Sequence, residues 1–96
     1  MTRSTVLATL QAHEPELRRL GVGRLDLFGS VARDDDGPAS DVDVLVEFDH
    51  PVGLFALVRL QLFLERLLGR RVDVTTPGAL RPGMRARVGA ELVRAA

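Results

Sequence analysis

The sequence feature that most constrains the fold is a 15-residue apolar stretch, Leu54–Leu68, in the middle of the chain. It contains three charged residues, and Gly69 follows it. A membrane-spanning helix needs about 20 apolar residues, so a stretch of this length and charge predicts a helix packed inside a globular domain. We expect the helix to run from about residue 52 to residue 68, to end at Gly69 and to cover a sheet.

Valine-rich segments on both sides of this helix predict strands. Val42–Phe48 precedes the helix and Arg71–Thr75 follows it. Arg24–Phe28 has no valine but also reads as a short strand. The helices expected elsewhere are a first one capped by Ser4, a short one from Glu14 to Leu20, a single turn at Val31–Arg33 and a last one at Pro82–Ala95. This order of elements assigns residues 1–96 to one small domain of the α/β (α+β) class.

Composition excludes several classes of protein. The chain has no cysteine, which excludes disulfide scaffolds and thiolate sites, and two histidines are too few for a histidine-built zinc site. No apolar segment follows Met1 as in a secretory signal, and none is long enough to span a membrane, so we expect a cytoplasmic protein. A chain of 96 residues also has no room for a separate substrate-binding domain, so an enzyme of this size needs help to hold its substrate.

The formal net charge is zero, but the charges are unevenly placed. Residues 34–58 hold seven acidic residues and no arginine, a net charge of −7, whereas segments 1–33 and 59–96 carry +2 and +5. Seven like charges repel one another unless they face solvent or cations lie among them. A solvated loop accounts for the first three acids, but it does not account for acids inside an apolar strand.

Asp41 and Asp43 are the acids that begin the strand of residues 42–48. Alternate side chains of a strand lie on one face, so the two carboxylates point the same way with Cα atoms roughly 6.5–7 Å apart. Such a pair is unfavourable without a divalent cation, and hard oxygen ligands suit magnesium, which also binds substrate phosphates. The pair therefore predicts a magnesium site of the kind used in two-metal displacement reactions.

Gly29 and Ser30 are separated from this pair by ten residues. Glycine lets the backbone turn at the end of the strand and approach a ligand closely, and Ser30 lies where a helical turn begins. Free N–H groups and a hydroxyl at such a point bind anions. A phosphate at Ser30 beside metals on Asp41 and Asp43 is the layout expected for a nucleoside triphosphate.

Asp73 is a third acid in a strand-like segment, where it stands between two valines. An ion pair with Arg70 or Arg71 is one explanation for it. If its strand neighbours the strand of Asp43, however, Asp73 can share a metal ion and accept a proton from an attacking hydroxyl. We favour this role in the site.

The pattern Gly29-Ser30-x10-Asp41-x-Asp43 resembles the signature of the polymerase-β-like nucleotidyltransferases. The similarity is closest to the minimal nucleotidyltransferases (MNT), short prokaryotic proteins paired with HEPN-domain partners, and it covers nearly the whole chain. Leu27–Arg33, the segment Val72–Leu80 and the arginine-rich last helix all resemble that group. Each half of the motif is weak alone, but both halves at this spacing, with a third strand acid, are specific.

The resemblance implies a mixed-sheet nucleotidyltransferase fold that binds ATP with magnesium, in two ions. Asp41, Asp43 and Asp73 would be the metal ligands and catalytic carboxylates, and Gly29, Ser30, Arg33 and Ser40 would lie around the nucleotide. It further implies the antitoxin of a type VII-like toxin–antitoxin system, which transfers AMP to a hydroxyl, of tyrosine, on a HEPN toxin.

Two of these residues, Arg33 and Ser40, have a second possible role. Arg33 either reaches the phosphates or forms a surface ion pair with the acids that follow it, and Ser40 either contacts the ligand or only closes the loop. The family commonly has glycine after the arginine at position 33, where this chain has Asp34. The departure leaves the path of the acidic loop, residues 34–40, open.

Other functions are also considered. The chain could be a non-catalytic antitoxin that neutralises the toxin by binding alone. Nucleotide transfer to a small molecule is disfavoured by length, because such enzymes carry an additional substrate-binding domain. Direct nucleic-acid binding is not expected, because the region of the motif is acidic and the chain has no set of stacking aromatic residues.

The helix of residues 54–68 has a second apolar strip beside the face expected to cover the sheet. At 100° per residue, Phe55, Val58 and Leu62 form this strip between two polar stripes. Either another helix of the domain covers it, or it is an interface with a partner or with a second copy of the chain. A homo-oligomer through this helix is therefore among the expectations.

Overall fold

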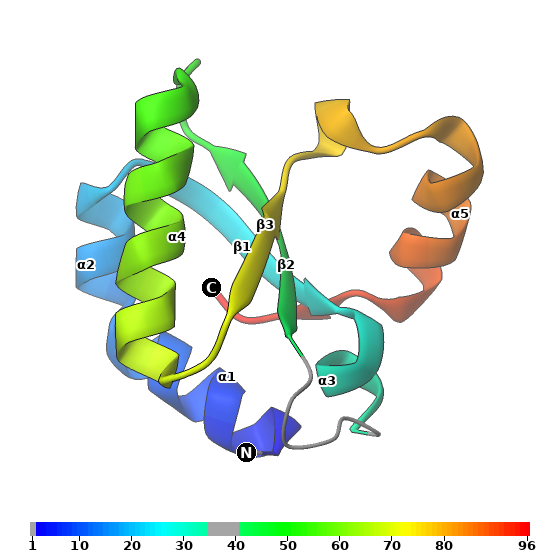
Figure 1. Ribbon diagram of the computed structural model, residues 1–96, viewed down its shortest axis with the longest axis horizontal. Helices are drawn as coiled ribbons and strands as arrows, with labels where there is room; N and C mark the ends of the chain where they lie inside the picture. Colours follow the sequence, from blue (N-terminus) through cyan, green and yellow to red (C-terminus); the bar gives the residue numbers. More distant parts are fainter. Residues whose placement is uncertain (1, 35–40) are drawn as a thin grey trace.

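The structure is a computed structural model that describes residues 2–34 and 41–96. It has a sheet with helices packed on both faces (Figure 1). The elements along the chain are α1 (Arg3–Ala12), α2 (Glu14–Arg19), β1 (Val22–Phe28), α3 (Gly29–Arg33), β2 (Val42–Phe48), α4 (Leu54–Leu68), β3 (Val72–Thr75), the 3₁₀ turn η1 (Pro77–Ala79), α5 (Pro82–Glu91) and β4 (Val93–Arg94).

The strands of the described chain form one mixed sheet in the order β3-β2-β1-β4. β2 and β3 are parallel, and α4 connects them, since a parallel pair needs a long crossover to bring the chain back to the same end of the sheet. β1 is antiparallel to both of its neighbours, β2 and β4. The predicted small α+β domain with a mixed sheet is confirmed.

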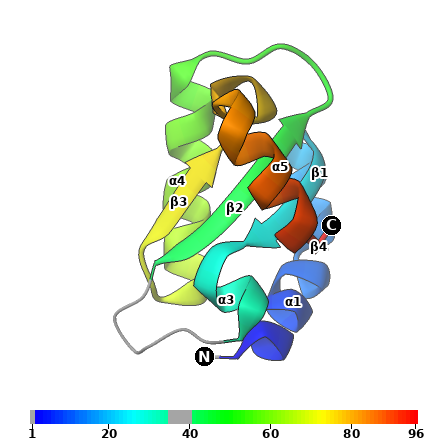
Figure 2. The same cartoon turned by 90° about the vertical axis from the view of Figure 1, so that its right-hand side faces the viewer.

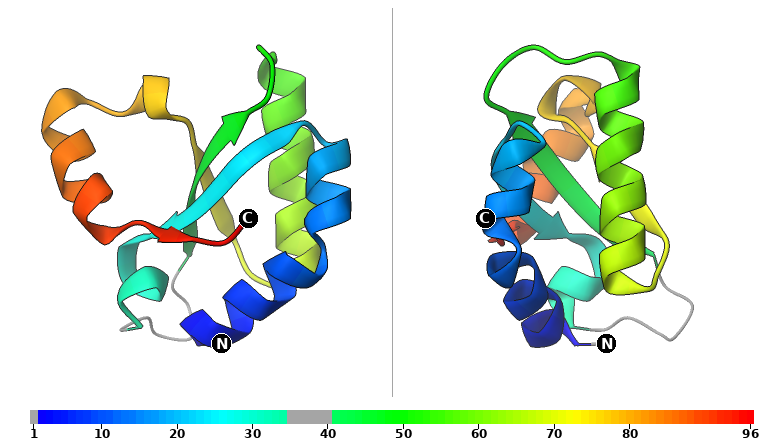
Figure 3. Two further views of the ribbon diagram at one scale, coloured as in Figure 1. Left: turned by 180° about the vertical axis from the view of Figure 1, so that it is seen from behind. Right: turned by 90° about the vertical axis from the view of Figure 1, so that its left-hand side faces the viewer.

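One face of the sheet carries the main hydrophobic core. Alternate residues of β2, Val42, Val44 and Val46, are fully buried there, together with Leu25 and Leu27 of β1. Helices α1, α2 and α4 cover this face (Figure 3). Their own fully buried side chains recur at helical spacing and are Val6, Leu10, Leu17, Leu60 and Leu64.

The opposite face is covered more thinly, by α5 (Figure 2). A small apolar cluster forms here from Leu45, Leu80 and Val88, with Phe28 and Leu92 packed against it. Val88 is the buried residue of α5. This face receives the side chains that alternate with the core valines of β2, and among these is Asp43.

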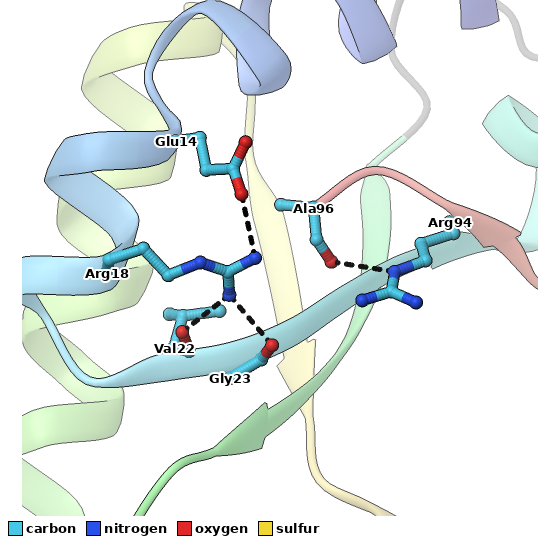
Figure 4. A network of polar contacts seen from close by, with 6 residues as sticks. All are labelled: Glu14, Arg18, Val22, Gly23, Arg94 and Ala96. Atoms are coloured by element: carbon cyan, nitrogen blue, oxygen red, sulfur yellow. Dashed lines mark hydrogen bonds and ion pairs between the residues drawn. The ribbon is translucent and has the colours of Figure 1, made fainter.

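The start of β1 is irregular, and an arginine supports it. The register of β1 against β2 shifts between Val22 and Arg24, which is a β-bulge. The Nη1 atom of Arg18 donates to the carbonyl oxygens of Val22 (2.8 Å) and Gly23 (2.7 Å), and its Nη2 atom donates to Glu14 (2.9 Å; Figure 4). The guanidinium thus gives these two carbonyls hydrogen-bond partners and ties α2 to the sheet.

Two helices start at residues other than those expected. Thr2 caps α1, accepting a hydrogen bond from the backbone N–H of Thr5 (3.2 Å), so the prediction of Ser4 as the cap is wrong. Helix α4 starts after Gly53, slightly later than the expected start at about residue 52, and Gly69 ends it in the left-handed conformation, as predicted. Several residues near a helix start can have similar propensities to begin the helix. The sequence then does not show which of them is the first helical residue.

The last helix was expected to continue to Ala95, but α5 ends at Glu91 and residues 93–94 form β4. The backbone N–H of Leu25 donates to Ala96 (3.0 Å), and that of Ala95 donates to the carbonyl of Leu25 (2.8 Å). A helix through this segment would leave these groups of the buried strand β1 without partners. The final residues therefore pair with strand β1 and do not continue the helix.

No other helix in the described part of the chain covers the apolar strip of α4. Phe55, Val58 and Leu62 are 88%, 42% and 56% exposed, and Leu54 is 72% exposed. The expectation that a helix of the same domain covers the strip is therefore wrong. Within residues 2–34 and 41–96, every helix is too short or too polar to cross a membrane.

Candidate active site

Asp43 and Asp73 lie directly opposite each other on neighbouring parallel strands. The register of β2 and β3 pairs Val42 with Val72 and Asp43 with Asp73. Because side chains alternate along each strand, the two carboxylates project from the same face of the sheet, away from the main core. This confirms the condition on which a role for Asp73 in the site depended, that its strand neighbours the strand of Asp43.

Gly29 brings the end of β1 against Asp43. Its φ angle is +75°, and a Cβ atom added to it would lie 2.3 Å from Oδ2 of Asp43. A side chain at this position would be strained by the backbone and would also collide with the carboxylate. The preceding residue, Phe28, is paired with Asp43 in the β1–β2 ladder, so α3 and its first residues, including Ser30, begin beside the acid.

The surroundings of Asp43 disfavour its ionised form. Burial is the largest cause of its raised pKa, and the negative charges of Asp73 and Asp41 raise the pKa further, while Arg33 lowers it. The carboxylates of Asp41 and Asp73 therefore repel the negative charge of Asp43, and the guanidinium of Arg33 partly offsets this repulsion. A cation placed among them would remove the repulsion.

The carboxylates suit a metal ion such as magnesium that is bound jointly by the protein and its substrate. Among the residues that the structure describes, they do not form a complete set of protein ligands. In the described part of the chain, no three His, Cys, Asp or Glu residues are grouped so as to hold a metal ion by themselves. Asp41 lies just before β2 and is exposed, whereas Asp43 is half-buried. Magnesium is usually bound by one or two carboxylates together with water and substrate phosphates, so the Asp43–Asp73 pair suits it and a complete protein cage is not required.

Arg33 contacts an element far away in the sequence. Its Nη1 atom lies 3.0 Å from Oε1 of Glu91, which joins α3 to the end of α5. Asp34 accepts a hydrogen bond from the backbone N–H of Arg3 (3.1 Å). Ser40 and the rest of the acidic loop lie outside the described residues, so the expectations for them stay predictions.

A cleft of about 430 Å³ opens beside the two paired carboxylates. Asp43 and Asp73 lie in it together with two threonines of the β3 end, and apolar side chains make up the rest of its lining: Phe28, Leu57, Val74, Ala79, Leu80 and Met84. Sequence reasoning missed these lining residues. They come from five separate elements or their ends, and nothing local in the sequence shows that they converge.

Comparison with known proteins shows that the chain is similar to nucleotidyltransferases. Residues 10–93 match the nucleotidyltransferase domain family. The protein adenylyltransferase MntA of Thermococcus cleftensis is 38% identical over 94 residues, which is 97% of this chain and 95% of the relative. A solved structure described as a minimal nucleotidyltransferase is 39% identical, covers 97% of this chain and 95% of its own, and superimposes with a TM-score of 0.84.

More distant structures share the fold. The MNT antitoxin in complex with the tri-AMPylated HEPN toxin of Shewanella oneidensis superimposes with a TM-score of 0.61 at 18% identity, over 91% of this chain and 71% of the other.

The family match and the two similar relatives show that the chain belongs to the nucleotidyltransferase domain family and, within it, to the minimal nucleotidyltransferases. The predicted family and class of enzyme are confirmed.

Proposed function

We propose that this nucleotidyltransferase transfers AMP from ATP to a tyrosine hydroxyl of a HEPN-domain toxin and so acts as its antitoxin, in a type VII-like system. The observation that carries the proposal is the pairing of Asp43 with Asp73 beside the tight Gly29 turn. The adenylyltransferase name of the Thermococcus cleftensis relative supports the reaction. The toxin complexes among the structures with the same fold support the partner.

Each residue of the site has a role in this proposal. Asp41, Asp43 and Asp73 would hold magnesium together with the substrate phosphates, and the metal would neutralise the triphosphate and the charge that develops in the transition state. Ser30 and the backbone N–H groups of the Gly29–Ser30 turn hold phosphate oxygens. Arg33 lies close enough to act on the charge of Asp43, and it supplies positive charge to the same region.

The reaction is a displacement at the α-phosphorus of ATP. The acceptor oxygen attacks that phosphorus, the bond to the bridging oxygen of the β-phosphate breaks, and pyrophosphate leaves. Asp73 accepts the proton of the acceptor hydroxyl, since it is the carboxylate on the outer side of the pair. The new bond joins AMP to the acceptor oxygen.

The experiment is incubation of the chain with ATP labelled at the α-phosphate, magnesium and the HEPN partner. We expect label on the partner, none without magnesium, and a loss of at least about 10²-fold in rate for Asp43→Asn. Wild-type protein that leaves the partner unlabelled would contradict the proposal. In cells, an Asp41→Asn, Asp43→Asn double variant should no longer protect against the toxin, and full protection by it would favour an antitoxin that acts by binding alone.

A further inference from the structure

Most of the cleft lies on the Asp73 side of the acidic pair, and the glycine turn follows β1 on the Asp43 side. Along the sheet, Gly29 and Ser30 follow β1, Asp43 lies on β2 and Asp73 lies on the edge strand β3. Phe28 at the end of β1 reaches the cleft, but Gly29 and Ser30 do not line it, and most of its residues come from β3, η1, α4 and α5. The larger part of the cleft therefore lies toward β3, the strand of Asp73, which follows β2 at the edge of the sheet. Figure 1 shows the positions of these two strands.

The geometry of the reaction assigns different groups to these two sides. In a displacement at phosphorus, the attacking and leaving oxygens lie roughly in line, on opposite sides of the phosphorus. With the outer phosphates at Gly29–Ser30, the leaving group departs toward α3. The attacking hydroxyl then arrives from the Asp73 side, where the cleft is.

The lining of the cleft fits one kind of acceptor. Its polar groups are the two carboxylates and the hydroxyls of Thr75 and Thr76, and the other side chains are apolar. A serine or threonine acceptor would leave the apolar lining without a partner. A phenol has an apolar ring that fills such a space and a terminal hydroxyl that reaches the carboxylates.

We propose that this cleft is the acceptor subsite, and that Leu57 of α4 and Met84 of α5 hold the aromatic ring of a tyrosine presented by the partner protein. The proposal rests on the proposed function and adds the residues that select the acceptor. Leu57 is half-buried, whereas Met84 is 46% exposed although it lines the cleft. An apolar side chain left this open is available for contact with a partner.

The test is the Leu57→Gln, Met84→Gln double variant in the AMP-transfer assay with the HEPN partner. We expect the KM for the partner to rise about tenfold or more, because polar groups replace the apolar contacts of the ring, with the KM for ATP unchanged. Leu57→Met with Met84→Leu is the matched control, since it keeps the cleft apolar and should keep the KM for the partner. Thermal unfolding of both variants shows that the fold is retained.

The outcomes separate this proposal from the one it rests on. A raised KM for ATP with an unchanged KM for the partner would mean that the cleft holds the nucleotide, and would overturn the acceptor subsite alone. Unchanged values for both substrates would overturn it too. A wild-type protein that transfers no AMP to the partner would overturn the acceptor subsite and the proposed function together.

Discussion

Gly29 lies where the end of β1 meets the carboxylate of Asp43. Two independent constraints act at this residue, a φ angle of +75° and the absence of space for a Cβ atom. Gly69 has a similar φ angle, +66°, but open space around it. The two glycines therefore allow the cost of the backbone conformation to be separated from the cost of the contact with the site.

We predict that Gly29→Ala lowers the AMP-transfer rate by at least about 10²-fold, because Asp43 must move away from the added methyl group. Gly69→Ala is the matched control: it should cost about 1 kcal/mol in the free energy of unfolding and leave the rate unchanged. Initial rates and thermal unfolding of both variants give the comparison. Equal rates for Gly29→Ala and wild type would contradict the placement of Asp43 in the site.

Asp43 also makes the stability of the metal-free protein depend on pH. Its pKa is raised above the ordinary value of 3.8, mainly by burial, so the folded protein binds its proton more tightly than the unfolded chain does. Proton binding by Asp43 therefore stabilises the folded state fully below pH 3.8. This contribution to the free energy of unfolding is lost as the pH rises through the raised pKa of Asp43. At neutral pH the ionised Asp43 opposes folding.

We therefore predict that Asp43→Asn raises the melting temperature of the protein in EDTA by a few degrees at pH 7, although it lowers the AMP-transfer rate by at least about 10²-fold. The difference from wild type should shrink as the pH falls toward 3.8. Scanning calorimetry over a series of pH values measures it. A melting temperature lower than that of wild type at pH 7 would show that Asp43 stabilises the fold in its ionised form.

Helix α5 is held to the rest of the structure by a small apolar cluster and an ion pair at its end. Val88, 5% exposed, packs against Leu45 and Leu80, and the Arg33–Glu91 ion pair holds the end of the helix. The members of that ion pair are 48% and 26% exposed, so the pair contributes little, about 0–1 kcal/mol. Packing of Val88 is thus the main attachment of α5 to this face of the sheet.

Replacing Val88 by alanine should loosen α5 before the rest of the domain. We expect a loss of about 1–2 kcal/mol of stability for the helix and faster hydrogen exchange of its amides, with exchange of β1 and β2 unchanged. Val58→Ala makes the same change at a 42% exposed position of α4 and should have an effect within about 0.5 kcal/mol. Exchange that accelerates equally in α5 and in the sheet would argue that α5 unfolds only with the whole domain.

The elements also differ in how far sequence predicts them. β2 and α4 are long, strongly patterned segments, and their expected extents match the structure apart from the start of α4. The last helix was predicted to be longer than it is because Leu92 continues the four-residue spacing of Met84 and Val88. In the structure Leu92 has an extended ψ angle of 131° and packs against the same cluster, and the chain then pairs with β1. A two-residue strand has too little pattern to compete with that spacing.

At the scale of the whole molecule, an apolar strip of α4 lies on the surface. It is formed by Leu54, Phe55, Val58 and Leu62. All four side chains are more than 40% exposed. Apolar patches of this kind on small domains mark contacts with other chains. Self-association through this helix stays a prediction from the sequence, and the structure leaves the strip accessible for it.

We predict that a Phe55→Gln, Leu62→Gln variant is monomeric under conditions in which the wild type forms oligomers, with the same melting temperature within a few degrees. The reason is that both side chains contribute to the exposed strip and neither is needed for the core. Analytical ultracentrifugation at several concentrations measures the change. Oligomers of undiminished strength in the variant would place the contact on another face.

What the sequence determined by itself is local: the alternation that makes strands, the helical period of residues 54–68, and the acids and the glycine–serine pair at positions where ordinary packing does not explain them. These features depend on residues within a few positions of one another, so their pattern is visible along the chain. Only the tertiary structure decided that β3 lies beside β2, that α3 and α5 meet through Arg33 and Glu91, and that Leu57 and Met84 line one cleft with Asp73. Those contacts join segments that are far apart in sequence, and they form because burying the two faces of one sheet brings the segments together.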